Sequence, residues 1–247
     1  MLKQMYYSAR DGMFVRAISF GIMMGINLFF LPFALRHPGG VMSILAIVFS
    51  SLALGHIIIA NGIISFSGLS EVFSAPGGYS LLLTPLPAWK ILLGKIIPAA
   101  VIDVAGGAIG IMWVVWYSLS FTGLSRTFVQ FVSVRDLLFV IGASFGGYLL
   151  LLTMFCFFRT LSRSVFYRLP LRGLLSIIVT FAVAGTINSW WGLLLAPFGT
   201  LEWIGPFLTI MLYTTLLNQL MVVLVVLLQA CTLFLASAYL TERKINI

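Results

Sequence analysis

Residues 216–240 read LLNQLMVVLVVLLQACTLFLASAYL and contain no Asp, Glu, Lys or Arg. A helix of about 20 apolar residues crosses the roughly 30 Å hydrocarbon core of a bilayer, so this stretch predicts a transmembrane helix. Five more apolar runs precede it, at residues 17–33, 41–64, 88–116, 137–158 and 171–195. The sequence therefore predicts an all-α membrane protein with six transmembrane helices.

Basic residues fall unevenly on the two sides of this six-span arrangement. Only Arg36, Arg126 and Arg135 fall on the side of the first, third and fifth loops. Because cationic loops stay in the cytoplasm during insertion, both termini are predicted to be cytoplasmic, in an integral, multi-pass protein of the cell membrane. The other eleven of the 14 basic residues group on the opposite side: Lys3, Arg10, Arg16, Lys90, Lys95, Arg159, Arg163, Arg168, Arg172, Arg243 and Lys244.

The composition agrees with a chain that lies almost entirely in the lipid bilayer. The 247 residues are 61% hydrophobic and 8% charged. Six spans leave little chain for another domain, so residues 1–247 are predicted to form a single transmembrane domain. The net charge of +8 is explained by juxtamembrane cations that meet anionic lipid heads, and we expect no nucleic-acid partner. Cys156 and Cys231 are expected to pack as apolar side chains.

The N-terminal residues 1–16 mix Met, Leu, Tyr and Phe with Lys3, Arg10, Asp11 and Arg16. Apolar and basic residues in such a mixture are typical of a helix that lies in the membrane interface. We therefore expect an N-terminal interfacial helix before the first span.

Residues 188–213, between spans five and six, are apolar and aromatic but contain several glycines and prolines. Because unpaired backbone amides are costly in lipid, such a broken segment must be shielded by protein or line a cavity. We predict a re-entrant or interfacial segment before the sixth span. Tryptophans favour the membrane–water interface, which places this segment in the outer leaflet through Trp190, Trp191 and Trp203.

The sequence lacks the residues for several activities found in membranes. No GxxxxGK[ST] motif is present, so the chain alone has no such site for ATP. Gly142-Ala143-Ser144 is similar to the Gly-x-Ser context of intramembrane serine proteases, but the two histidines, His37 and His56, both precede it. A serine nucleophile would have no base in a later span. We expect no catalytic residue, no metal site and no cofactor bound by this chain.

Asp103 is the one acidic residue deep within a predicted span. A carboxylate at this depth is costly and marks a functional candidate. Small residues share its helix face, which favours close helix packing, so Asp103 is predicted to point into protein. A structural hydrogen bond at a helix seam and a direct part in transport both fit this placement. The small residues are Ala99, Ala100, Gly106, Gly107 and Gly110.

Uncharged polar residues in the spans are further candidates, either to line a pathway or to form interhelical hydrogen bonds. These residues are Asn27, His56, Asn61, Asn218 and Gln229.

The most distinctive loop joins spans two and three, with the sequence SGLSEVFSAPGGYSLLLTPLPAWKILLGK at residues 67–95. Pro76-Gly77-Gly78 and Thr84-Pro85-Leu86-Pro87 interrupt the backbone on either side of residues 79–83. A short helix between two such breaks, on the cytoplasmic side, suits docking to a partner protein.

This loop resembles the corresponding loop in membrane subunits of ATP-binding cassette exporters of the six-span permease family. The shared pattern is a Glu, a Gly, a short Leu-rich helix, Thr-Pro and a Gly-Lys that opens span three. The family's common Glu-Arg pair is absent, because Val72 follows Glu71, and the spacing from Gly78 to Pro85 is shorter than usual. The matching residues are Glu71, Gly78, Leu81, Leu82, Leu83, Thr84, Pro85, Gly94 and Lys95.

The resemblance implies that Glu71, Gly78 and residues 81–85 belong to a short coupling helix that fits a cleft in a separate ATPase. ATP and Mg would be bound by that partner. It also implies a second permease, either another copy of this chain or a related permease, with an ATPase dimer, and export of an amphipathic drug, peptide or lipid. Residues 188–213, with Trp190, Trp191 and Trp203, would then form an outer gate.

Two other functions fit the same composition. One is a non-transporting membrane scaffold or sensor. The other is an ion-coupled secondary carrier that uses Asp103, although carriers of this kind often contain internal repeats and residues 1–120 do not resemble residues 121–247.

Overall fold

A computed structural model describes residues 10, 12–36, 40–73, 86–122, 134–195 and 216–245. These residues form six helices, each long and apolar enough to cross a membrane, and no strand. The prediction of an all-α membrane protein with six spans is therefore confirmed. The helices are α2 (Met13–Arg36), α3 (Val41–Val72), α5 (Ala88–Thr122), α7 (Val134–Ser164), α8 (Arg172–Leu195) and α10 (Leu216–Ile245).

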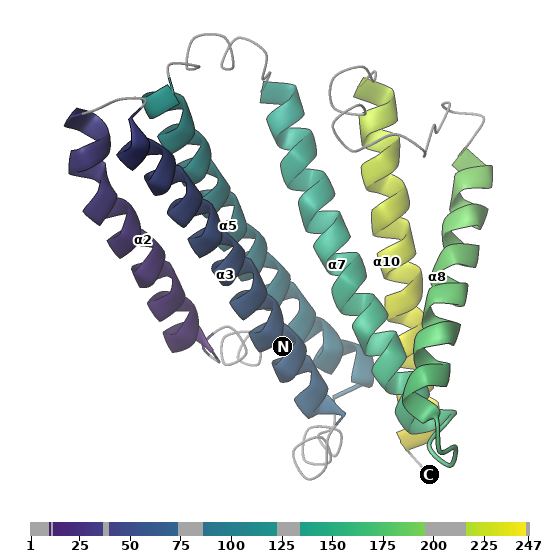
Figure 1. Cartoon of the computed structure of the whole chain (residues 1–247). Helices are drawn as coiled ribbons and strands as arrows, with labels where there is room; N and C mark the ends of the chain where they lie inside the picture. Colours follow the sequence, from purple (N-terminus) through teal and green to yellow (C-terminus); the bar gives the residue numbers. More distant parts are fainter. Residues whose placement is uncertain are drawn as a thin grey trace.

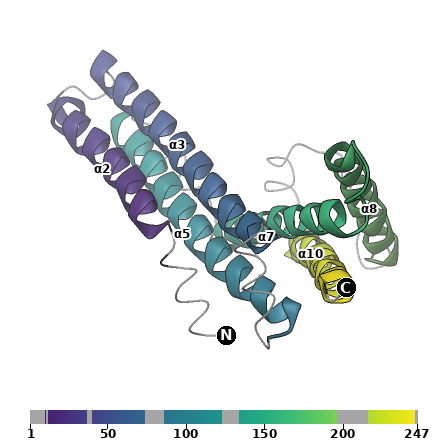
Figure 2. The same cartoon turned by 90° about the horizontal axis from the view of Figure 1, so that it is seen from below.

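Consecutive helices run in opposite directions and form two groups of three (Figure 1). In one group α3 packs against both α2 and α5, and in the other α7, α8 and α10 pack against one another. Contacts of α5 with α7 and α10 join the two groups, which Figure 2 shows from below. Helix α2 begins and α10 ends at the same end of the bundle. We call it the inner end, because the charge pattern predicts it to be cytoplasmic.

Helix α3 continues further than the predicted second span, which ended at residue 64. It runs without proline to Val72, so residues 67–72 are helical and Glu71 lies in the last turn. The chain then closes that turn, because the N–H of Phe73 donates to the carbonyl of Ser70 at 3.0 Å. The prediction that the loop starts at residue 67 is wrong, since residues 65–72 contain no proline to interrupt the helix.

The first helix also differs from its prediction. Residues Met13 to Arg16 belong to α2, whereas the sequence placed them in an interfacial helix. Residues 1–9 and 11 lie outside the described part of the chain. The predicted coupling helix at residues 79–83 lies outside it as well. Of the predicted re-entrant segment, residues 188–195 continue α8, and residues 196–213 are outside the description.

The largest group of buried apolar residues lies toward the inner end, where α3, α5 and α7 meet. It includes Leu69 and Val72 of α3, Ile91 and Leu92 of α5, and Leu152 of α7. Each of these five side chains is almost fully buried. This packing holds the end of α3 against the start of α5.

The helices contain three pairs of glycines four residues apart, Gly21/Gly25, Gly106/Gly110 and Gly142/Gly146, and the last two pairs lie at helix contacts. A Cβ atom on Gly146 of α7 would lie 3.3 Å from Val226 of α10, and one on Gly110 of α5 would lie 2.5 Å from Leu54 of α3. Substituting either glycine would therefore require its neighbour to move. A Cβ on Gly21 or Gly25 would meet nothing within 4 Å.

Candidate functional site

The carboxylate of Asp103, on α5, is bound by side chains from three other helices. Arg16 of α2 donates from Nε to Oδ1 at 3.1 Å and its Nη2 forms an ion pair with the same oxygen at 3.0 Å. Ser65 of α3 and Tyr148 of α7 both donate to Oδ2, the tyrosine at 2.5 Å. We call Arg16, Ser65, Asp103 and Tyr148 the Asp103 cluster.

Both charges of this cluster are withdrawn from solvent. The side chain of Asp103 is 4% exposed and that of Arg16 is 10% exposed. Arg16 also donates from Nη2 to the Ser65 hydroxyl at 2.9 Å. A buried ion pair offsets its desolvation only when the geometry is good and the remaining polar atoms are hydrogen-bonded. Here both carboxylate oxygens are engaged, so the cluster is a neutralised link between four helices.

The local sequence explains how Arg16 reaches α3 and α5. Gly12 precedes α2 with a φ of 73°, a backbone conformation that side chains disfavour. A Cβ on Gly12 would also lie 2.4 Å from Cγ2 of Ile64 on α3. Glycine therefore lets the chain turn tightly against α3, one helical turn before Arg16.

Asn61 and Gly106 extend the seam between α3 and α5 beyond the cluster. Asn61 is one turn from Ser65, and Gly106 is nearly one turn from Asp103. A Cβ on Gly106 would lie 3.5 Å from Nδ2 of Asn61. The prediction that Asp103 points into protein is confirmed, but not every small residue on its face contacts another helix, because a Cβ on Gly107 would meet nothing within 4 Å.

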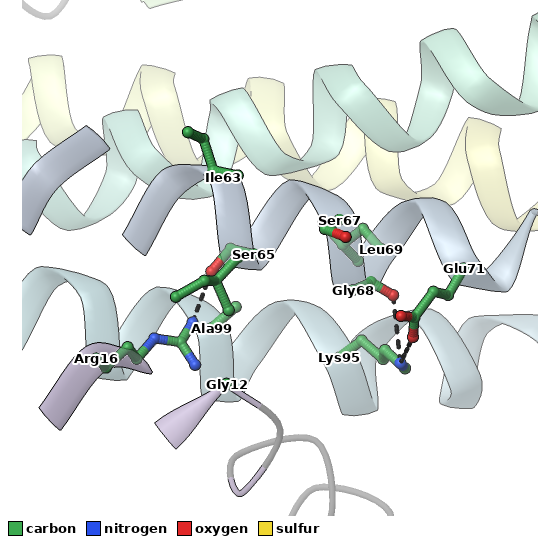
Figure 3. Close-up of a pocket in the computed structure, with 11 residues that line it drawn as sticks. Gly12, Arg16, Ile63, Ser65, Ser67, Gly68, Leu69, Glu71, Lys95 and Ala99 are labelled. Carbon is green, nitrogen blue, oxygen red and sulfur yellow. Dashed lines mark hydrogen bonds and ion pairs between the residues drawn. The ribbon is translucent and has the colours of Figure 1, made fainter. Parts of the chain in front are cut away.

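A cavity of about 280 Å³ lies beside the cluster, where α2, α3 and α5 meet toward the inner end. Lys95 of α5 lines it and donates from Nζ to the carbonyl of Gly68 at 3.2 Å. The same Nζ is 3.7 Å from Oε2 of Glu71, in the last turn of α3. Figure 3 shows both contacts and the Arg16–Ser65 hydrogen bond. The lining residues are Gly12, Arg16, Ile63, Ile64, Ser65, Ser67, Gly68, Leu69, Glu71, Lys95 and Ala99.

Of the residues predicted to couple to an ATPase, the structure describes Glu71. Its side chain is 64% exposed and paired with Lys95. The others, Gly78, Leu81, Leu82, Leu83, Thr84 and Pro85, lie outside the described residues.

The uncharged polar candidates whose side chains the structure describes are not brought together. Asn27 is buried in α2, donates to the Met23 carbonyl at 2.7 Å and accepts from Ser50 of α3. His56 is exposed and lines a second cavity of about 320 Å³ between α2 and α3. Asn61 is buried at the α3–α5 seam. These three residues therefore lie at separate positions along the first helix group.

The remaining two polar candidates belong to α10, in the other helix group. Gln229 is buried and donates from Nε2 to the carbonyl of Ala184 on α8 at 2.8 Å. It therefore joins two helices. The side chain of Asn218 lies outside the described residues.

The outer-gate candidates lie on and beyond the last turns of α8. Trp190 is 69% exposed and Trp191 is half-buried. An exposed tryptophan near a helix end suits the membrane interface. Trp203 lies outside the described residues.

Sequence reasoning missed three members of the Asp103 cluster. Arg16 was grouped with the cytoplasmic cations, and Ser65 and Tyr148 were not singled out. A usable signal existed for Arg16, since a carboxylate buried in a membrane needs a counter-ion and Arg16 directly precedes an apolar run. Ser65 and Tyr148 carry no comparable signal, because single hydroxyl groups are frequent in membrane helices.

The chemistry of the cluster is that of a closed ion pair. Within the described residues, no group of three or more His, Cys, Asp or Glu side chains could hold a metal ion. No protein-family model, no curated protein and no solved structure matches this chain.

Proposed function

We propose that this chain is the transmembrane subunit of an ATP-binding cassette exporter and moves an amphipathic drug, peptide or lipid. A separate ATPase subunit would bind ATP and Mg and drive the transport. A second permease copy would complete the translocation unit in the cell membrane.

The observation that carries the proposal is the pairing of Glu71 with Lys95. These are the first and last charged residues of the stretch that resembles the exporter family, and Nζ and Oε2 lie 3.7 Å apart. Lys95 also binds the Gly68 carbonyl, so the end of α3 is tied to the start of α5. Residues 74–85 connect the end of α3 to the start of α5, and these two helix ends are bound to each other.

Such an arrangement would let a conformational change in an ATPase move the transmembrane helices. A partner that moves residues 74–85 would move α3 and α5 as a unit, because Leu69 and Val72 pack with Ile91 and Leu92 in the same buried cluster. Close-packed protein interiors have low compressibility and transmit strain. The Asp103 cluster would carry the same movement to α2 through Arg16 and to α7 through Tyr148.

The geometry of Asp103 favours an ion-coupled carrier less than it favours the exporter. Both oxygens of its carboxylate accept hydrogen bonds, from Arg16, Ser65 and Tyr148. A carrier site must bind and release its ion, whereas this carboxylate has a fixed counter-ion. Asp103 therefore has a structural role in the proposed exporter, as the group that links four helices.

Native mass spectrometry of the complex, extracted in a mild detergent from its own membrane, tests the proposal. We expect two permease subunits, either two copies of this chain or this chain with a related permease, together with two ATPase subunits that carry a Walker motif. If the chain is released without a nucleotide-binding subunit, under conditions that preserve other transporter complexes, the exporter proposal is wrong.

A further inference from the structure

The ammonium group of Lys95 lines the 280 Å³ cavity between α2, α3 and α5 and uses few of its hydrogen-bond donors. Its side chain is 11% exposed, and an ammonium has three N–H donors. Among the described residues it makes one hydrogen bond, to the Gly68 carbonyl at 3.2 Å. The contact with Glu71 at 3.7 Å is longer than a hydrogen bond. An acceptor that entered the cavity would therefore find donors available.

The rest of the polar lining contains one more cation, one carboxylate and two serines. Arg16 lines the same cavity, with its charge balanced by Asp103. Ser65, whose hydroxyl is bonded within the Asp103 cluster, and Ser67 line it as well. The one carboxylate in the lining belongs to Glu71, whose side chain is 64% exposed. The Glu71 side chain is therefore more exposed to solvent than that of Lys95, which is 11% exposed.

One rim of the cavity is apolar and faces away from the protein. Ile63 lines the cavity and is 64% exposed. Ile59, one turn further along α3, is also 64% exposed. In a membrane these two side chains lie against acyl chains. The cavity therefore combines a cationic interior at the inner end of the helices with an open apolar side.

We propose that this cavity binds the phosphate of an inner-leaflet phospholipid. Lys95 is the donor to the phosphate, Arg16 lines the same cavity while paired with Asp103, and an acyl chain lies along Ile63 and Ile59. Basic pockets between transmembrane helices on the cytoplasmic side suit anionic headgroups, and lysine binds phosphate as a point charge. The inference concerns lipid recognition and does not depend on the exporter proposal.

Thermal unfolding of the purified full chain in a nonionic detergent tests the site. A ligand that binds the folded state raises the Tm by an amount that grows with the ratio of its concentration to its Kd. Three probes are added separately: dioleoylphosphatidylglycerol, dioleoylglycerol, which lacks the phosphate, and inorganic phosphate. We expect phosphatidylglycerol alone to raise the Tm at submillimolar concentration.

Two variants remove the site by different means. Lys95→Met removes the charge and keeps most of the side-chain length. Gly68→Leu fills the cavity, and a Cβ at Gly68 meets nothing within 4 Å, so the backbone tolerates it. Each should raise the phosphatidylglycerol concentration needed for a given rise in Tm roughly tenfold or more, as expected for the loss of a charge-assisted hydrogen bond. Each variant is compared with its own lipid-free Tm.

The matched controls are Lys90→Met and Gly55→Leu. Lys90 lies on the same helix but contacts the Trp89 ring, and Gly55 of α3 also has no atom within 4 Å of a Cβ. Both controls should respond to phosphatidylglycerol as the unchanged chain does. Equal responses in all four variants would overturn the proposal. An equal response to inorganic phosphate would overturn the assignment to a lipid, as would an equal response to dioleoylglycerol.

Discussion

Arg16 and Asp103 are 87 positions apart in the sequence and form an ion pair at 3.0 Å beside the first turn of α2. The pair connects α2 to α5. With Ser65 and Tyr148 it joins four of the six helices at one point.

Arg16→Met should lower the free energy of unfolding by roughly 3–5 kcal/mol, because it leaves a buried carboxylate without its counter-ion. Arg163→Met, at an exposed position of α7, is the matched control and should change stability by less than about 0.5 kcal/mol. Equilibrium unfolding in mixed micelles measures both variants.

The double variant Arg16→Met/Asp103→Asn completes a cycle for the pair. Because it removes both charges, its loss of stability should be smaller than the sum of the two single losses by about 1–3 kcal/mol. Transport per folded molecule should largely survive in Asp103→Asn, as a structural role requires. Strict additivity of the two losses would show that the pair does not stabilise the fold.

Tyr148→Phe tests the link from the Asp103 cluster to α7. The change removes one hydroxyl that donates to the carboxylate at 2.5 Å and keeps the ring. Hydrogen bonds to charged groups contribute roughly 1.5–3 kcal/mol, and a loss in that range is expected. Tyr239→Phe, on an exposed face of α10, should be neutral. Equal stability of the two variants would mean that the hydroxyl contributes nothing.

Gln229→Leu should be tolerated, although the side chain is buried. Its hydrogen bond to the Ala184 carbonyl joins α10 to α8 at 2.8 Å. Such bonds between membrane helices contribute about 0.6 kcal/mol on average and at most about 1.7. The free energy of unfolding should decrease by an amount within that range, and transport should be unchanged. Loss of transport in a stably folded Gln229→Leu variant would instead place this residue in the pathway.

The six helices could be predicted from the sequence because membrane helices need only length and apolarity. Their ends could not, since α3 and α7 run past the apolar runs into polar residues such as Glu71 and Arg163. A backbone without proline or a glycine pair has no reason to stop at the membrane surface. Apolarity therefore locates a span better than it locates the ends of its helix.

The candidate site was predictable only in part. The burial of Asp103 follows from the cost of a charge in lipid and from the small residues on its helix face. Its partners depend on which helices are neighbours, and no periodicity within α5 reveals that α2, α3 and α7 meet there. The cavity beside Lys95 depends on the same packing and had no sequence signal.

Cysteine labelling tests the predicted topology. In a background of Cys156→Ala and Cys231→Ser, single cysteines are placed at Ser125 and at Leu169, which is exposed between α7 and α8. The excess of basic residues on one side predicts that an impermeant maleimide added outside intact cells labels position 125 and not position 169. Labelling of position 169 and not of position 125 would contradict the prediction that both termini are cytoplasmic.

The dependence of the chain on an ATPase is measured most directly with Leu82→Asp, within the stretch that resembles a coupling helix. A charge forced into an apolar socket leaves an unpaired buried ion, which costs several kcal/mol. The readout is the amount of ATPase subunit retained per chain after purification, together with ATP-dependent transport in proteoliposomes. Leu169→Asp is the matched control on another loop at the inner end. We expect Leu82→Asp to lose the ATPase and transport while Leu169→Asp keeps both; full retention of both by Leu82→Asp would contradict the proposed coupling.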